Sequence, residues 1–168
     1  MDQHVVKPTS GGLALNLSEK ALRRAIELLF FAYRDFTAEA DALLAHYGFG
    51  RAHHRVIYFV GRHPGVSVSE LLIILKITKQ SLSPVLGQLM REGFVVQLPD
   101  SADRRRRRLY LTAEAEALER QLTARQARRI AAAFEDAGAE AAAGFTEVLR
   151  AIVNEEDRRR FETPDGQA

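Results

Sequence analysis

The sequence predicts a mainly α-helical protein with a small β wing, arranged as a winged helix-turn-helix. Three observations predict this fold. Residues 67–91 hold two short segments of helical periodicity joined by a tight turn. Residues 94–111 hold two β-rich segments separated by an arginine-rich loop. Long helical patterns lie on both sides, so we expect N- and C-terminal helices that flank the winged unit.

Composition excludes several classes of site. The chain of 168 residues is long enough for one domain with a core, and its 46% hydrophobic and 27% charged residues are ordinary for a globular protein. Cysteine is absent, which excludes disulfides, thiolate metal sites and thiol redox chemistry by this chain. The net charge is only +2, but residues 104–108 are five consecutive arginines, so positive charge is concentrated in one place.

The ends of the chain carry no sign of a membrane segment or a secretory signal. No apolar run reaches the ~18–20 residues of a membrane span, and the first residues lack the apolar part of a signal peptide. We therefore expect a cytoplasmic protein without membrane contact. Residues 1–16 predict a flexible N-terminus and residues 162–168 a frayed tail, which leaves a single domain over residues 17–161.

The first long helix is predicted over about residues 18–47, with Ser18 as its N-cap. One apolar face packed on a local core explains most of its pattern. A helix of ~30 residues would however be ~45 Å long, more than a small winged domain covers, and the surplus suggests a partner chain. The apolar residues that repeat at steps of three and four are Leu22, Ile26, Leu29, Phe30, Tyr33, Phe36, Ala40, Leu43, Leu44 and Tyr47.

The winged unit is predicted over about residues 51–112 and begins with a helix from Arg51 to Gly61. Ser67 and Glu70 have the spacing of a capping box before the next apolar run. After a short turn, Thr78 caps the second helix of the motif. The inward stripe of that helix is Leu82, Val85, Leu86, Leu89 and Met90.

The opposite face of this second helix is small, polar and basic, as a helix in the major groove of DNA requires. Glutamine can bond adenine, and lysine or arginine can bond guanine or phosphate. Taken alone, such a face is more often simply solvated. The candidate base-contacting residues are Lys79, Gln80, Ser81, Ser83 and Gln88.

The wing is predicted from strands at about residues 94–98 and 108–111. Five consecutive arginines repel one another unless an anionic group binds them. A loop that is simply solvated is therefore a weaker interpretation here than for an ordinary charged loop. We expect Asp100 and Asp103 to brace arginine side chains rather than to bind metal. The candidate contacts to phosphate or the minor groove are Arg104, Arg105 and Arg106.

The C-terminal part predicts two more helices, over about residues 113–161, which would form a helical dimerisation layer with the first. Thr112 caps the first of them, which ends near Gly138. Its stripe of Leu118, Leu122, Ile130 and Phe134 is thin for its length. The last helix, about 139–161, is expected to bury Phe145, Val148, Leu149, Ile152 and Val153.

This order of elements resembles the MarR family of winged helix-turn-helix regulators over about residues 18–160. The most specific parts are GRHPGVSVSELLIILKITKQSLSPVLGQLMREGFV and the wing DSADRRRRRLYLT. The resemblance implies a homodimer that binds a pseudo-palindromic operator in double-stranded DNA. It also implies release of DNA when a small, often aromatic or phenolic, ligand enters a cleft between the DNA-binding lobe and the dimer helices.

Three residues depart from the family's pattern. Pro84 stands where the family usually has arginine, Gly87 replaces a polar or basic residue, and Ala102 replaces the first arginine of the wing. Pro84 removes the backbone donor to Gln80, which costs ~3 kcal/mol in a helix interior. The helix could instead start at Ser83, with Pro84 at its favoured first position. Leu82 keeps phase with the inward stripe, however, so we expect a kinked or strained helix that continues through the proline.

Two interpretations of function follow, and an enzyme is not one of them. The first is a dimeric transcriptional regulator, with half-sites ~10 bp apart or a multiple of it. The alternative is a winged-helix protein with weakened base readout that acts as a sensor or protein-interaction module. A steep salt dependence of DNA binding would favour the first. Catalytic motifs such as His-Glu-x-x-His, a P-loop or Gly-x-Ser-x-Gly are absent from the sequence.

An effector pocket is the remaining hypothesis, and no metal or cofactor is expected with it. Adjacent histidines on a helix point ~100° apart, which does not suit a shared metal. The aromatic residues concerned are as readily explained as core. The candidate pocket residues are Phe30, Tyr33, His53, His54 and Tyr58.

Overall fold

The computed structural model describes residues 17–101 and 103–161, so the expected flexible N-terminus and frayed tail lie outside the described residues. The chain divides into two units, Met1–Thr37 and Ala38–Ala168, and helix α1 (Glu19–Ala45) belongs to both. Within the described ranges, no helix is both long and apolar enough to cross a membrane.

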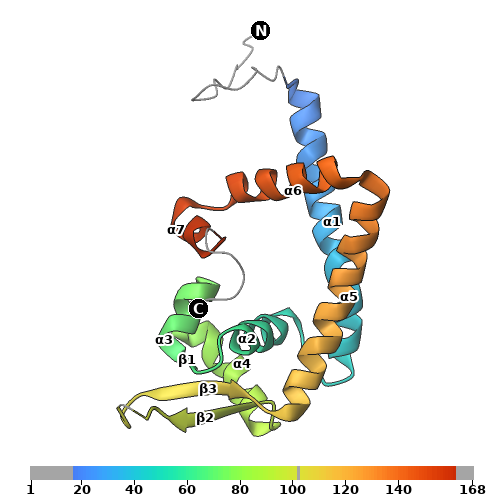
Figure 1. The fold of residues 1–168 in the computed structure, drawn as a ribbon. Helices are drawn as coiled ribbons and strands as arrows, with labels where there is room; N and C mark the ends of the chain where they lie inside the picture. The colour runs from blue at the N-terminus through green and yellow to red at the C-terminus, as the bar shows by residue number, and fades with distance from the viewer. Residues whose placement is uncertain (1–16, 102, 162–168) are drawn as a thin grey trace. The chain divides into compact units, whose positions relative to one another are not determined.

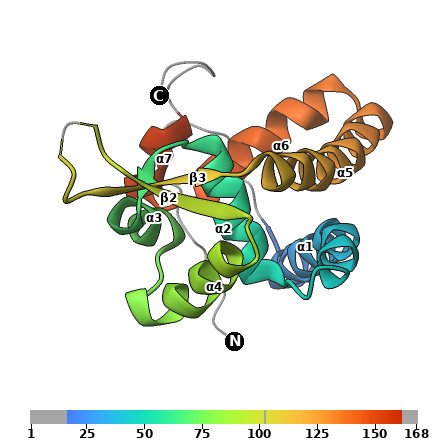
Figure 2. The same ribbon diagram turned by 90° about the horizontal axis from the view of Figure 1, so that it is seen from below.

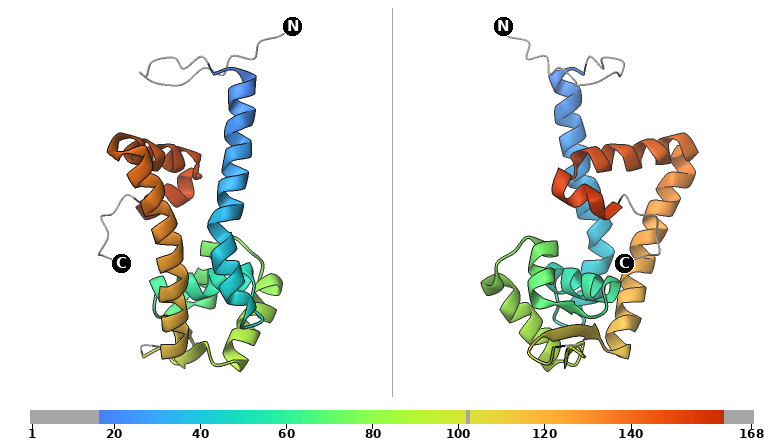
Figure 3. Two further views of the ribbon diagram at one scale, coloured as in Figure 1. Left: turned by 90° about the vertical axis from the view of Figure 1, so that its right-hand side faces the viewer. Right: turned by 60° about the vertical axis from the view of Figure 1, so that its left-hand side comes forward.

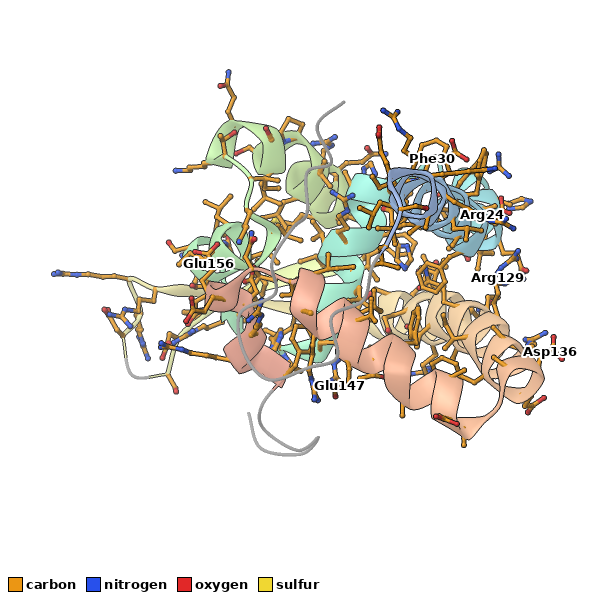
Figure 4. All side chains as sticks on the ribbon, turned by 90° about the horizontal axis from the view of Figure 1, so that it is seen from above. Arg24, Phe30, Arg129, Asp136, Glu147 and Glu156 are labelled. Atoms are coloured by element: carbon orange, nitrogen blue, oxygen red, sulfur yellow. The ribbon has the colours of Figure 1, made fainter. Side chains whose placement is uncertain are left out.

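Helix α1 begins as predicted, because the Oγ of Ser18 accepts a hydrogen bond from the backbone N–H of Ala21 at 3.2 Å. The apolar residues of its N-terminal half are exposed, which corrects the expectation that most of the apolar residues of this helix lie in a local core. Ile26 is 68% exposed and Phe30, labelled in Figure 4, is 65% exposed. In the second unit, by contrast, Ala40 and the later residues of α1 take part in a core.

The second unit contains the winged helix-turn-helix, and Figures 1 and 2 show its hairpin extending away from the small helices. Its core combines buried residues of α2, α3 and α4 with Leu109 of the sheet and Leu118 of the following helix. The elements are α2 (Arg51–Arg62), β1 (Val66–Ser67), α3 (Val68–Leu75), α4 (Lys79–Arg91), β2 (Val95–Pro99) and β3 (Arg107–Leu111).

The sheet has three strands rather than the predicted two. Its order is β1-β3-β2, and both pairings are antiparallel. Strand β1 is only two residues long, too short to show an alternating pattern in the sequence, and it pairs Val66 with Leu109 and Ser67 with Arg108. The extra strand ties the start of α3 to the base of the wing.

The C-terminal part forms α5 (Ala113–Ala137) and α6 (Ala139–Ile152), which separate at Gly138 with a φ of 87° (Figures 1 and 3). The prediction of one final helix to Phe161 is wrong. Val153 and Asn154 have ψ of 136° and 146°, so the chain is extended there before the short α7 (Glu155–Arg158) and the 3-10 turn at 159–161.

The expected burial of the α6 stripe is also wrong for the single chain. Helix α6 has no buried residue, and Phe145, Val148 and Ile152 are 43%, 59% and 59% exposed. Helical periodicity indicates which face is apolar, but it does not indicate what covers that face. One contact does form across the turn at Gly138, where the ring of Phe134 meets that of Phe145 edge-on at 5.6 Å.

Candidate nucleic-acid interface

The helix-turn-helix is built by the local caps that the sequence predicts. The Oγ of Ser67 accepts from the N–H of Glu70, and the Glu70 carboxylate accepts from the N–H of Ser67 at 2.7 Å. Lys76 then takes a left-handed conformation with φ of 51°, which ends α3. The Oγ1 of Thr78 accepts from the N–H of Ser81 and begins α4. Side-chain caps therefore define the starts of both helices, and the left-handed Lys76 ends the first of them.

These same bonds affect the ionisation of Glu70. The backbone and side-chain hydrogen bonds from Ser67 hold the pKa of its carboxyl below the usual value, and Arg108 acts in the same direction. The capping bonds thus favour the charged form of this carboxyl group.

Helix α4 buries Leu82, Leu86 and Leu89 and turns its polar side outward. Four of the five predicted base-contacting residues lie on this exposed side. Two of the hydroxyls also bond within the protein: Ser83 donates to the carbonyl of Lys79 at 2.8 Å, and the Ser81 hydroxyl lies 3.0 Å from that of Thr78. The exposed predicted residues are Lys79, Gln80, Ser81 and Ser83.

Gln88, the fifth predicted residue, is half-buried and is engaged within the protein. The Nδ1 of His53 accepts from the N–H of Gly50 at 3.1 Å, so the Nε2 carries the proton and donates to the Gln88 side-chain oxygen at 2.9 Å. The Gln88 amide nitrogen donates to Glu92 at 2.9 Å. His53 itself stacks on Phe49, with ring centroids 4.9 Å apart. Sequence reasoning missed this contact because 35 residues separate its partners.

Pro84 lies inside α4, which runs without a break from Lys79 to Arg91. The prediction that the helix starts ahead of the proline is therefore correct. Pro84 and its neighbour Ser83 are exposed. Gly87 is half-buried, and a Cβ there would meet only the Nη1 of Arg91, at 3.4 Å.

The arginine run divides into two roles. Arg108 turns inward: its Nε donates to Asp100 at 2.6 Å, and its Nη1 donates to the carbonyl of Gly65 and to Glu70, both at 3.2 Å. The hydrogen bond to Asp100 raises the pKa of this guanidinium. Arg108 thereby joins the wing to the loop before β1 and to the first turn of α3. The expectation that Asp100 braces an arginine is confirmed.

The remaining arginines of the run are exposed. Arg106 lies 3.7 Å from Asp103, and the Oδ1 of Asp103 accepts from the N–H of Arg105 at 3.0 Å, so the second aspartate also braces the wing. Among the described residues, no carboxylate lies within ion-pair distance of Arg104, Arg105 or Arg107. Arg107 was absent from the predicted set, although strand alternation next to the inward Arg108 places it outward.

The predicted effector-pocket residues are divided between the two units. Phe30 and Tyr33 belong to the first unit, where they are 65% and 46% exposed, so they are not core. His53, His54 and Tyr58 belong to the second unit and are half-buried. Over residues 17–101 and 103–161, no group of three or more acidic or histidine side chains is arranged to hold a metal ion.

His54 differs from His53 in its surroundings. Burial lowers the pKa of its imidazole below the usual 6.5, although the nearby carboxylates of Asp41 and Glu119 oppose the shift. Asp41 pairs with Arg51 at 2.8 Å through one carboxylate oxygen. This polar cluster lies where the end of α1, α2 and α5 meet.

Comparison with known proteins decides the family. The sequence model of the MarR family matches residues 47–106. The HTH-type transcriptional regulator PetP of Rhodobacter capsulatus is 43% identical over 152 residues, which cover 90% of this chain and 92% of PetP. The chain belongs to the MarR family of transcriptional regulators. It is thus a DNA-binding regulator rather than an enzyme.

Solved MarR-family structures share the fold. FabT of Streptococcus pneumoniae in complex with DNA has a TM-score of 0.67 and 21% identity, over 78% of this chain and 94% of FabT. NadR in complex with 4-hydroxyphenylacetate has a TM-score of 0.58 and 25% identity, over 88% of this chain and 97% of NadR.

Proposed function

We propose that this MarR-family regulator works as a homodimer that binds a pseudo-palindromic operator, with α4 in the major groove and the wing against the phosphate backbone or the minor groove. The observation that carries the proposal is the pairing of an exposed polar face on α4 with a wing whose exposed Arg104 and Arg105 have no carboxylate partner among the described residues. Arg108, which bonds to Asp100 of the wing, holds the wing to the first turn of α3 through Glu70.

In this proposal the residues of the interface have separate tasks. Lys79, Gln80, Ser81 and Ser83 face base edges and flanking phosphates. Arg104, Arg105 and Arg106 neutralise phosphate or enter the minor groove. Gln88 has a positioning role, because both ends of its amide are held by His53 and Glu92. Binding of this kind places the working protein in the cellular compartment that holds the DNA.

The proposed dimer interface uses the apolar faces that each unit leaves exposed. Large apolar residues exposed on one helix face, as on α1 and separately on α6, mark an interaction site in a globular protein. The family resemblance implies that a second copy of the chain covers these faces. A homodimer places two identical recognition helices on a two-fold symmetric DNA site. The exposed apolar residues are Leu22, Ile26, Leu29, Phe30, Phe31 and Tyr33 of α1 with Phe145, Val148 and Ile152 of α6.

The experiment is selection of bound sequences from a random duplex pool at two salt concentrations, with the mass of the free protein and of its complex measured by analytical ultracentrifugation. Enrichment of a pseudo-palindrome with half-sites ~10 bp apart, bound by two chains, supports the proposal. Salt-sensitive binding without enrichment would instead support the alternative, a winged-helix module with weakened base readout. A monomeric complex would refute the dimer.

We also propose a small aromatic or phenolic acid as effector, because the NadR structure contains 4-hydroxyphenylacetate. In this chain the half-buried imidazole of His54, near Arg51 and Arg55, offers polar groups beside the aromatic Tyr58 on α2. Titration of the protein–operator complex with 4-hydroxyphenylacetate and salicylate tests this. Release of DNA that His54→Ala abolishes supports the proposal, while unchanged affinity at millimolar ligand refutes it for this class.

A further inference from the structure

The exposed face of α4 carries an apolar ring at its middle, where hydrogen-bonding groups are scarce. Pro84 is exposed there. The hydroxyl hydrogen of Ser83, its neighbour, is directed to the carbonyl of Lys79. Gln88, one turn further on, has its amide engaged with the protein. The surface that would meet the centre of a half-site is therefore a pyrrolidine ring rather than an array of donors.

The surroundings of the ring leave it accessible. At 100° per residue, Gln80, Pro84, Gly87 and Arg91 fall along one strip of α4. Gly87 adds no side chain beside the ring, and the Arg91 guanidinium lies across that position, because its Nη1 is 3.4 Å from where a Cβ would stand. An amide at one end and a guanidinium at the other thus border a small apolar surface.

The stability of α4 does not account for this proline. Pro84 has no N–H to donate to the carbonyl of Gln80, and its ring crowds that carbonyl. Alanine at the same position would restore the hydrogen bond and would suit a helix better. The exposed ring contributes nothing to the buried side formed by Leu82, Leu86 and Leu89.

We propose that Pro84 is a specificity-determining residue whose ring packs against the 5-methyl group of a thymine in each half-site. This inference rests on the proposed function, in which α4 lies in the major groove. The thymine methyl is the one apolar group on the major-groove edges of the four base pairs, and apolar side chains contact it. A cytosine at that position would present an amino donor, for which the ring has no acceptor.

The test uses the operator obtained by selection, with each thymine replaced in turn by deoxyuridine, which removes the methyl group and leaves all hydrogen-bonding groups in place. Affinity is measured by fluorescence anisotropy for wild-type protein, Pro84→Ala and the control Gln121→Ala, which changes an exposed residue of α5 outside the DNA-binding surface. Pro84→Ala is expected to fold, because it restores the helical donor; circular dichroism of both variants checks this.

At one thymine position per half-site, the substitution should weaken wild-type binding about fourfold, and about 15-fold when both half-sites are changed, from the free energy of burying one methyl group. Pro84→Ala should bind the thymine and uracil operators equally, while Gln121→Ala should keep the wild-type preference. Wild-type indifference to every replacement, or an undiminished preference in Pro84→Ala, would overturn the inference and leave the proposed function standing. Failure to select any operator would overturn both.

Discussion

Replacing Arg104 and Arg105 with alanine tests whether the wing contacts phosphate, and its effect can be estimated from the structure. Both side chains are exposed and have no carboxylate partner among the described residues. Each phosphate that an arginine neutralises adds about −0.9 to the slope of log affinity against log salt concentration. Two arginines in each wing of a dimer should therefore flatten the slope by about 3.6.

Because the slopes differ, the loss of DNA affinity in the variant should depend steeply on salt concentration. The ratio of wild-type affinity to variant affinity should be about 150-fold larger at 50 mM salt than at 200 mM salt. Affinities for a fixed operator and for an unrelated duplex, measured by anisotropy over that range, give both slopes. A flattening of about half the expected size would mean that one wing per complex contacts phosphate.

The matched control is Arg125→Ala with Arg128→Ala. Both residues are exposed on α5, and their replacement lowers the net charge by the same amount without touching the wing. An equal flattening in this control would show that net charge, rather than the wing, causes the salt dependence. An unchanged slope in the wing variant would refute the phosphate contacts altogether.

Three further predictions concern the unit that holds the interface. Thr112→Ala removes the cap of α5 and the hydrogen bond that the Thr112 hydroxyl donates to the carbonyl of Gly93 (2.8 Å). It should lower the free energy of unfolding by about 2 kcal/mol, measured by thermal denaturation at fixed protein concentration. Thr112→Ser should be near wild type, and an equal loss of stability in both variants would contradict this prediction. Burial lowers the pKa of His54 in the folded protein, so the unfolded chain binds the proton more readily. The contribution of His54 to stability is therefore full above about pH 6.5 and falls as the pH drops towards the folded-state pKa. His54→Gln should flatten this pH dependence of the free energy of unfolding, measured by urea titrations. Gln88→Ala breaks the bond from His53 and should cost about 1 kcal/mol of stability without altering the selected operator, whereas a changed base preference at full stability would make Gln88 a base contact.

The features that the sequence predicted well are those decided by near neighbours. Ser67, Thr78 and Thr112 each accept a hydrogen bond from an N–H three residues ahead, so residue type and spacing suffice to place the helix starts. Pro84 could be placed inside α4 because Leu82 keeps the phase of the buried stripe. The exposed polar side of α4 followed from the same periodicity.

The features that could not be predicted depend on contacts between distant parts of the chain. Arg108 meets Glu70 across 38 residues, and within a run of five arginines no local signal distinguishes the inward one. The engagement of Gln88 by His53 is of the same kind. For α6, the apolar stripe of Phe145 and Val148 was found correctly, but its exposure was not, because the pattern is identical whether the covering surface comes from the same chain or another.

The register of β3 against β2 should be kept even when the number of arginines in the run changes. Arg108 stands opposite Leu98 and Leu109 opposite Gln97. A slip of β3 by one residue that brings Arg107 opposite Leu98 would keep an arginine at that position, but it would move Leu109, which is fully buried, to the other face of the sheet. The apolar residue therefore keeps the register. Loss or gain of one arginine at the tip would then change how far the wing reaches along DNA while its anchorage at Asp100 stays the same.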